Sequence, residues 1–263
     1  SFFGSVRRKA GKVPTAMVGP VAEASPGALN GSPSLTLPAA SISLPAAPAL
    51  VTRPTGTDYL AALQGLARRP DQPIALSVSL PFCAVRCLCC DRVISAAQSN
   101  AVLDDYVAGL MQEMQSLAEC IGAGRDVVQV HLGGGSANEL SESHLAWLVR
   151  AMRRHWRLPA DADMSVECDP RRSGWMQLQV LRGLGFRQVT FGVLDLDPLV
   201  QRAIGRLNSP ALIDDICQVA RSCDIGSISL ALMIGLPYQT PERWRVTLER
   251  LVDIAPERLR VTR

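Results

Sequence analysis

The sequence has little net charge and no long apolar segment, and both absences limit what the protein can do. Its 27 Lys and Arg residues exceed its 24 Asp and Glu residues by three, and they are spread along the chain. Charge therefore predicts no nucleic-acid or membrane partner. No segment reaches the roughly 18 apolar residues of a membrane span. The start of the chain also lacks a secretory signal, because prolines interrupt LTLPAASISLPAAPALV every few residues.

The first part of the chain, residues 1–56, is poor in acids and aromatics. Glu23 is its one acid, Phe2 and Phe3 are its aromatics, and it holds eight of the 18 prolines. Such a segment buries too little apolar surface to offset its ordering entropy. We expect a disordered or extended tail over residues 1–56, which either docks onto a protein partner or, by its Arg, Ser and Ala bias, acts as a targeting peptide.

From residue 57 to 263, strand-like and helix-like segments alternate. Several strands are apolar on both faces, and the spacing of the β/α units suits parallel pairing, which predicts either an open doubly wound α/β sheet or a partial (β/α)6 barrel. Both folds place their working groups at the C-terminal ends of the strands. The predicted strands are 74–80, 127–132, 164–169, 188–193, 227–236 and 258–263. The predicted helices are 58–70, 99–124, 141–156, 175–185, 197–205, 210–223 and 240–254.

Four of the eight cysteines lie between positions 83 and 90, directly after the first of these strands. Cys83, Cys87 and Cys90 have the spacing C-x3-C-x2-C, which lets a loop present three thiolates to three irons of a 4Fe–4S cluster and leaves the fourth iron open. A zinc knuckle and ordinary buried cysteines are the alternatives. Zinc usually takes four ligands in two spaced pairs, and no second C-x2-C pair follows. Clustered thiols without a signal peptide favour metal binding in the reducing cytoplasm.

This loop, placed after the first strand of a β/α series, resembles that of the radical S-adenosylmethionine superfamily. LSVSLPFCAVRCLCC is especially similar to the corresponding segment of oxygen-independent coproporphyrinogen III oxidases. The likeness continues in order from Thr57 to Arg263 through VHLGGGSANEL, SVECDPR, GFRQVTFGV, VQRAIGR, IGLPYQTPERW and PERLRV.

The resemblance implies a partial (β/α)6 barrel whose mouth holds a 4Fe–4S cluster and S-adenosylmethionine. It implies oxidative decarboxylation of porphyrinogen propionates in haem biosynthesis, with a porphyrinogen-type small molecule as substrate and an electron donor protein as partner. Cys83, Cys87 and Cys90 match the cluster ligands. Glycines let a backbone approach a ligand closely, and an arginine fork suits a carboxylate. The positions that match the cofactor-binding residues of the family are Gly133, Gly134, Gly135, Glu167 and Arg206.

Several positions depart from the family's pattern. Ser77 and Ser79 replace Tyr and His, and Cys89 replaces an aromatic residue. Leu194 replaces Gln, and Ala231 replaces an Asp that helps to hold the ribose. Each lost polar partner weakens ligand binding by roughly 1–3 kcal/mol. The sequence also ends at the sixth strand, before the family's C-terminal region. Two alternatives to an enzyme therefore stay open: a non-catalytic relative that binds a cluster, haem or a protein, and a structural subunit of a larger complex.

Overall fold

The computed structural model describes residues 16–19, 56–96 and 99–263. Within these ranges the main sheet has seven strands in the order β1-β2-β5-β6-β7-β8-β9. The strands are β1 (Ala16–Gly19), β2 (Ile74–Leu80), β5 (Val127–Gly134), β6 (Asp163–Cys168), β7 (Gln188–Leu194), β8 (Ser227–Met233) and β9 (Arg258–Thr262). Apart from β1 and Gly56, the predicted tail at 1–56 lies outside the described residues.

The six strands predicted from the sequence are all present and all parallel to their neighbours. They follow one another across the sheet in chain order, without the reversal of order that defines a doubly wound fold. The partial (β/α)6 barrel is therefore the correct alternative. β1 adds an antiparallel strand on the outer edge of β2, which the sequence did not predict.

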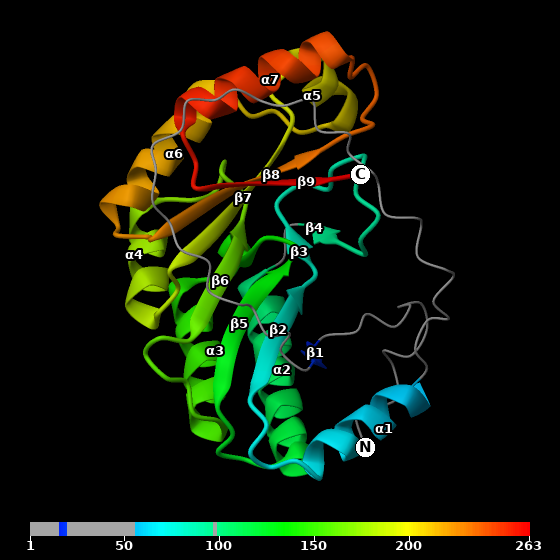
Figure 1. The fold of residues 1–263 in the computed structure, drawn as a ribbon, viewed down its shortest axis with the longest axis vertical. Coiled ribbons are helices and arrows are strands. Elements are labelled where there is room, and N and C mark those ends of the chain that lie inside the picture. Colours follow the sequence, from blue (N-terminus) through cyan, green and yellow to red (C-terminus); the bar gives the residue numbers. More distant parts are fainter. Residues whose placement is uncertain (1–15, 20–55, 97–98) are drawn as a thin grey trace, which may run out of the picture.

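The predicted helices connect the strands and lie on one side of the sheet, whereas the cysteine loop lies on the other (Figure 1). Ser141 and Thr240 begin their helices as predicted, each accepting a hydrogen bond from the backbone N–H three residues later. The helices are α1 (Gly56–Ala67), α2 (Asn100–Ile121), α3 (Glu142–His155), α4 (Trp175–Leu184), α5 (Pro198–Ile204), α6 (Pro210–Ser222) and α7 (Pro241–Ile254).

The core lies between the sheet and the helices. In β2, Ile74, Leu76, Val78 and Leu80 are buried, and the residues between them are only partly buried. β7 and β8 show the same alternation, so the strands are not apolar on both faces as the sequence suggested. Except for Leu194 and Met233 at the ends of β7 and β8, the second face of these strands carries small or polar residues, which leave room for a cavity.

Two short strands shape the cysteine loop, and the sequence did not predict them. β3 (Phe82–Cys83) and β4 (Ser95–Ala96) pair in parallel and bring the two ends of the loop together. β8 also ends at Met233, three residues before the predicted end of that strand.

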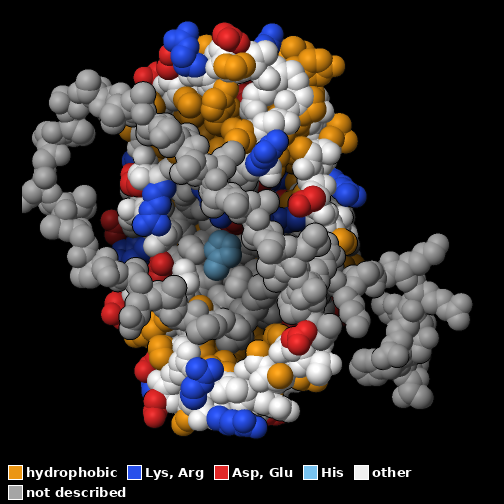
Figure 2. Space-filling model, turned by 45° about the vertical axis from the view of Figure 1, so that its right-hand side comes forward, with side chains coloured by type: hydrophobic (Ala, Val, Ile, Leu, Met, Phe, Trp, Pro, Cys, Tyr) orange, Lys and Arg blue, Asp and Glu red, His pale blue; other side chains and the backbone are white. Residues whose placement is uncertain are grey.

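The surface agrees with the low net charge. On the face shown in Figure 2, the basic and acidic side chains that the structure describes are interspersed. Within the described ranges, no helix combines the length and apolar character that crossing a membrane requires.

Candidate cofactor site

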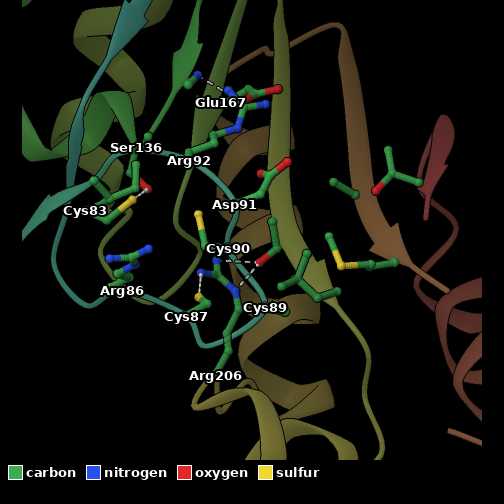
Figure 3. A pocket seen from close by; sticks show the side chains of 18 of the residues that line it. Cys83, Arg86, Cys87, Cys89, Cys90, Asp91, Arg92, Ser136, Glu167 and Arg206 are labelled. Atoms are coloured by element: carbon green, nitrogen blue, oxygen red, sulfur yellow. Dashed lines mark hydrogen bonds between the residues drawn. The ribbon is translucent and has the colours of Figure 1, made fainter. Parts of the chain in front are cut away.

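One cavity of about 210 Å³ lies at the C-terminal ends of the strands and holds nearly all the predicted site residues. This edge is where a β/α barrel collects its functional groups. Figure 3 shows the cysteine loop on one side of the cavity and the strands on the other. The predicted site residues that line the cavity are Cys83, Cys87, Cys90, Gly134, Gly135, Glu167 and Arg206. Three of the positions that depart from the family's pattern also line it: Cys89, Leu194 and Ala231.

The cysteine loop presents free thiols, since all eight cysteines are unpaired. A turn closed by the Cys90 N–H and the Cys87 carbonyl sets the spacing of the second and third ligands. Burial raises the pKa of the Cys83 thiol, while a contact with the Ser136 hydroxyl, 3.9 Å away, acts in the opposite direction. The Cys83 thiol therefore releases a proton when metal binds.

The donor set fits an iron–sulfur cluster better than a single metal ion. Among the described residues, no three His, Cys, Asp or Glu side chains converge on a point that would hold one ion. A closed zinc site would need such convergence. In a 4Fe–4S cluster, by contrast, each thiolate binds a different iron, so the sulfurs stand apart around a shared cavity. Three thiols that line one cavity match the second arrangement.

Arg206 lies beside the cysteine loop and is buried. Its Nη1 donates to Cys87 Sγ at 3.3 Å, while its Nε and Nη2 donate to the Gly192 carbonyl at 3.0 and 2.6 Å. A Cβ atom on residue 192 would lie 3.0 Å from Nη2, so glycine at this position makes room for the guanidinium. The structure thus places Arg206 at the predicted site, with its fork directed at protein acceptors.

Glu167, near the end of β6, has the most strongly shifted pKa among the carboxylates that line the cavity. Its Oε1 accepts a hydrogen bond from Arg260 on β9 and lies 3.7 Å from His131 Nε2. Its Oε2 accepts from the Gly134 N–H at 3.3 Å. Burial alone would raise the pKa of Glu167, but the hydrogen bonds and charges of His131 and Arg260 outweigh it and lower the pKa to about 2. Glu167 is therefore ionised at neutral pH.

The glycine run at 133–135 allows close packing of β5 against neighbouring segments. A Cβ atom on Gly135 would lie 2.2 Å from the Phe82 carbonyl oxygen, and one on Gly133 would lie 2.4 Å from His131 Nε2. Gly134 has φ +94°, a region that glycine occupies without strain. Gly134 and Gly135 also line the cavity, so the run has a packing role in addition to the predicted approach to a ligand.

Comparison with known proteins identifies the family that this geometry suggests. Residues 77–251, about two thirds of the chain, match the radical SAM superfamily. This chain belongs to the radical SAM superfamily. Its relatives include the oxygen-independent coproporphyrinogen III oxidases of Escherichia coli K12, 36% identical over 76% of this chain, and Pseudomonas aeruginosa, 35% identical over 78%. The chain spans less than half of these relatives, 44% and 45% of their lengths.

Solved structures agree with this assignment. Escherichia coli coproporphyrinogen III oxidase, described as a radical SAM enzyme, superposes with a TM-score of 0.71 at 33% identity and covers 79% of this chain and 47% of its own. A radical S-adenosylmethionine methyltransferase from Kitasatospora setae, with a TM-score of 0.51 at 18% identity, shares the fold alone: the match covers 74% of this chain and 36% of that one.

In this radical SAM protein, two of the departing residues, Cys89 and Leu194, form an apolar wall together with Met233. Cys89, Leu194 and Met233 pack against a small buried cluster of Val200, Ile204 and Leu236. Leu194 has φ +70°, an uncommon backbone conformation for a branched residue that places it at the cavity. This wall offers apolar contact to a ligand, with Thr190 and Thr262 as nearby hydroxyl-bearing residues of the lining.

Sequence reasoning placed Asp169 at the C-terminal end of the third strand but missed that Asp169, Arg171 and Asn138 hold the predicted residues in place. Asp169 is buried, accepts from Arg171 at 2.6 Å and lies 3.6 Å from Arg206 Nη2. Burial raises the pKa of Asp169, but the hydrogen bonds of Arg171 and the charge of Arg206 lower it below its usual range. Asn138 exchanges two hydrogen bonds with the backbone of Asp169. The sequence signal was the pair Asp169 and Arg171 directly after a strand.

Proposed function

We propose that this chain is the cofactor-binding core of a radical SAM enzyme of the coproporphyrinogen III oxidase type, which oxidatively decarboxylates porphyrinogen propionates in haem biosynthesis. Cys83, Cys87 and Cys90 would hold a 4Fe–4S cluster, and S-adenosylmethionine would bind at the open iron. One observation carries the proposal: the three thiols share a cavity with an ionised glutamate and a buried arginine, in a chain whose relatives include enzymes of that name.

The residues of the chain bind and orient the reactants. Arg206 donates a hydrogen bond to the Cys87 sulfur and so helps to fix the position of this ligand. Glu167, ionised and held by Arg260, accepts hydrogen bonds from ribose hydroxyls. The wall of Cys89, Leu194 and Met233 excludes water from the adenosine side. When bound, the cluster would supply the single electron that reductive cleavage of S-adenosylmethionine requires.

The working environment follows from the same chemistry. An electron donor protein must reduce the cluster, and the thiols must stay reduced before the cluster assembles. We therefore place the protein in the cytoplasm, where thiols persist. The S-adenosylmethionine and porphyrinogen molecules are its small-molecule partners.

Anaerobic reconstitution tests the proposal. The protein, incubated with iron and sulfide, should take up about four irons per chain, and dithionite with S-adenosylmethionine should then yield 5′-deoxyadenosine. Substituting any one of Cys83, Cys87 or Cys90 by Ser should abolish both. The matched control is Cys120→Ser, an exposed thiol on α2, which should leave iron uptake unchanged. Uptake of zinc in place of iron, or loss of iron in the control only, would overturn the proposal.

A second candidate is a cluster-binding relative without catalysis. The apolar residues Leu194 and Ala231, at positions where the family carries polar groups, favour it. The same experiment separates the two candidates, because a stable cluster without 5′-deoxyadenosine identifies the non-catalytic relative.

A further inference from the structure

Arg86 and Arg92 are two arginines of the cysteine loop that line the cavity and make no hydrogen bond or ion pair with another described residue. Four arginines line this cavity in the described part of the chain. Arg206 and Arg260 donate to protein acceptors, as shown above. Arg86 and Arg92 are exposed and make no hydrogen bond or ion pair with any described residue. Figure 3 shows both arginines on the cysteine loop at the cavity.

The charge balance of the cavity favours an anionic ligand at these two arginines. Among the acids that line it, Glu167 is already paired with Arg260, which leaves Asp91. Arg86 and Arg92 together therefore exceed the remaining acid by one charge. A guanidinium offers planar paired donors that bind a carboxylate through two parallel hydrogen bonds. Two such groups at separate points of one cavity suit a ligand that carries at least two carboxylates.

The same loop exposes large apolar side chains next to its arginines in the sequence. Val85, Leu88 and Val93 are 52%, 79% and 69% exposed. The loop is nevertheless anchored, because the Leu88 N–H donates to the Ile204 carbonyl at 2.9 Å. Several exposed apolar side chains on one anchored segment are typical of a binding surface. A ligand that fits both features has an apolar body and a periphery of carboxylates.

We propose that the cysteine loop also recognises the substrate, with Arg86 and Arg92 binding two propionate carboxylates of a porphyrinogen while Val85, Leu88 and Val93 contact its ring. The inference rests on the proposed function and extends it to the substrate. Arg86 precedes the second cluster ligand and Arg92 follows the third by two residues. The loop therefore ties the position of the macrocycle to the position of the cluster, so that one propionate is brought to the reaction centre while others are held.

Equilibrium dialysis under anaerobic conditions tests this inference on the reconstituted protein. The probe is coproporphyrin III, the stable oxidised macrocycle, which keeps four propionates. Arg86→Gln and Arg92→Gln should each weaken its binding roughly tenfold, as expected for a partly exposed charged hydrogen bond. Lys at either position should restore part of the affinity, because it keeps the charge but loses the fork. Binding of the tetramethyl ester, which lacks the charges, should be equal in all variants.

The controls keep the result interpretable. Arg68→Gln removes an exposed arginine outside the cavity and should bind coproporphyrin III like the parent protein. Iron content, measured in every preparation, confirms that each variant has kept its cluster. Equal binding by the parent, Arg86→Gln and Arg92→Gln proteins would overturn the inference, as would no binding by the parent.

Failure of this inference is distinguishable from failure of the proposed function. If the parent protein yields 5′-deoxyadenosine but the arginine variants bind the porphyrin normally, the loop does not recognise the carboxylates and the enzyme assignment stands. If binding depends on the arginines but S-adenosylmethionine is not cleaved, the recognition site stands and the enzymatic activity is wrong.

Discussion

Replacing Arg260 by Leu should raise the pKa of Glu167 and reduce the stability of the protein at neutral pH. The pKa of Glu167 lies at about 2 instead of its ordinary 4.5. Each pKa unit corresponds to about 1.4 kcal/mol, so the whole depression is at most about 3 kcal/mol. His131 supplies part of it, and the Arg260 side chain is 48% exposed, which screens its charge. We therefore expect Arg260→Leu to reduce the free energy of unfolding by about 1–2 kcal/mol.

The sign of the pH dependence follows from the depressed pKa. The stabilisation by ionised Glu167 is fully present above its unfolded-state pKa near 4.5 and is lost as pH falls from there through about 2. Without Arg260 the folded-state pKa is higher and the two pKa values are closer. The variant should therefore lose less stability than the parent protein when both are acidified from pH 5 to pH 3.

Urea unfolding at several pH values measures this difference. The matched control is Arg258→Leu, which lies two residues earlier on the same strand and donates to Gln188 instead of a carboxylate. Carbon-13 NMR of the carboxyl carbons, with the spectrum of Glu167→Gln to assign the signal, reads the pKa directly. Identical pH profiles for the parent and Arg260→Leu proteins would refute the role of this ion pair.

Three further substitutions test how the site is built. Gly135→Ala should lower stability by about 1–3 kcal/mol and reduce iron uptake in reconstitution, because the new Cβ would meet the Phe82 carbonyl oxygen. Gly183→Ala, exposed within α4 with open space around its Cβ, should reduce neither. Arg125 donates hydrogen bonds to four backbone carbonyls. Because Arg125→Met leaves these carbonyls without a donor, it should reduce the free energy of unfolding by about 2–4 kcal/mol and lower the midpoint of thermal unfolding. Asp169→Asn should reduce the free energy of unfolding in urea by about 2–3 kcal/mol, because it removes the negative charge that compensates Arg171 and Arg206. An unchanged unfolding midpoint would contradict this prediction.

Periodicity and spacing were sufficient to predict the main sheet. The sequence indicates six strands with helices between them, and few topologies fit this order. The parallel barrel in chain order was one of the two folds predicted. The strands that were missed are short. β3 and β4 have two residues each, so no hydrophobic period can develop, and their pairing depends on the loop that they enclose. β1 joins the sheet only through its contact with β2.

The sequence proposed residues that the structure brings to one cavity, but it did not predict their contacts. Cysteine spacing and position after a strand located the loop. The Arg206 guanidinium donates to the Gly192 carbonyl because its long side chain reaches β7 from the end of α5. No local sequence pattern predicts such a contact. The role of Arg260 was also not predictable, because a basic residue in the last strand has no distinctive sequence pattern. Its contact with Glu167 exists only because the curved sheet brings β9 opposite β6.

The substitution at position 231 and the position of Arg260 are two parts of one arrangement. Ala231 is the register partner of Arg260 on β8, and both line the cavity. Between Glu167 and Arg260 the lining residues of β7 and β8 are Thr190, Gly192 and Ala231, which are small enough for the guanidinium to pass over them. An acid at 231 would lie next to Arg260 and attract it away from Glu167. The alanine therefore does more than remove a polar partner, because it lets Arg260 hold Glu167 ionised across the barrel.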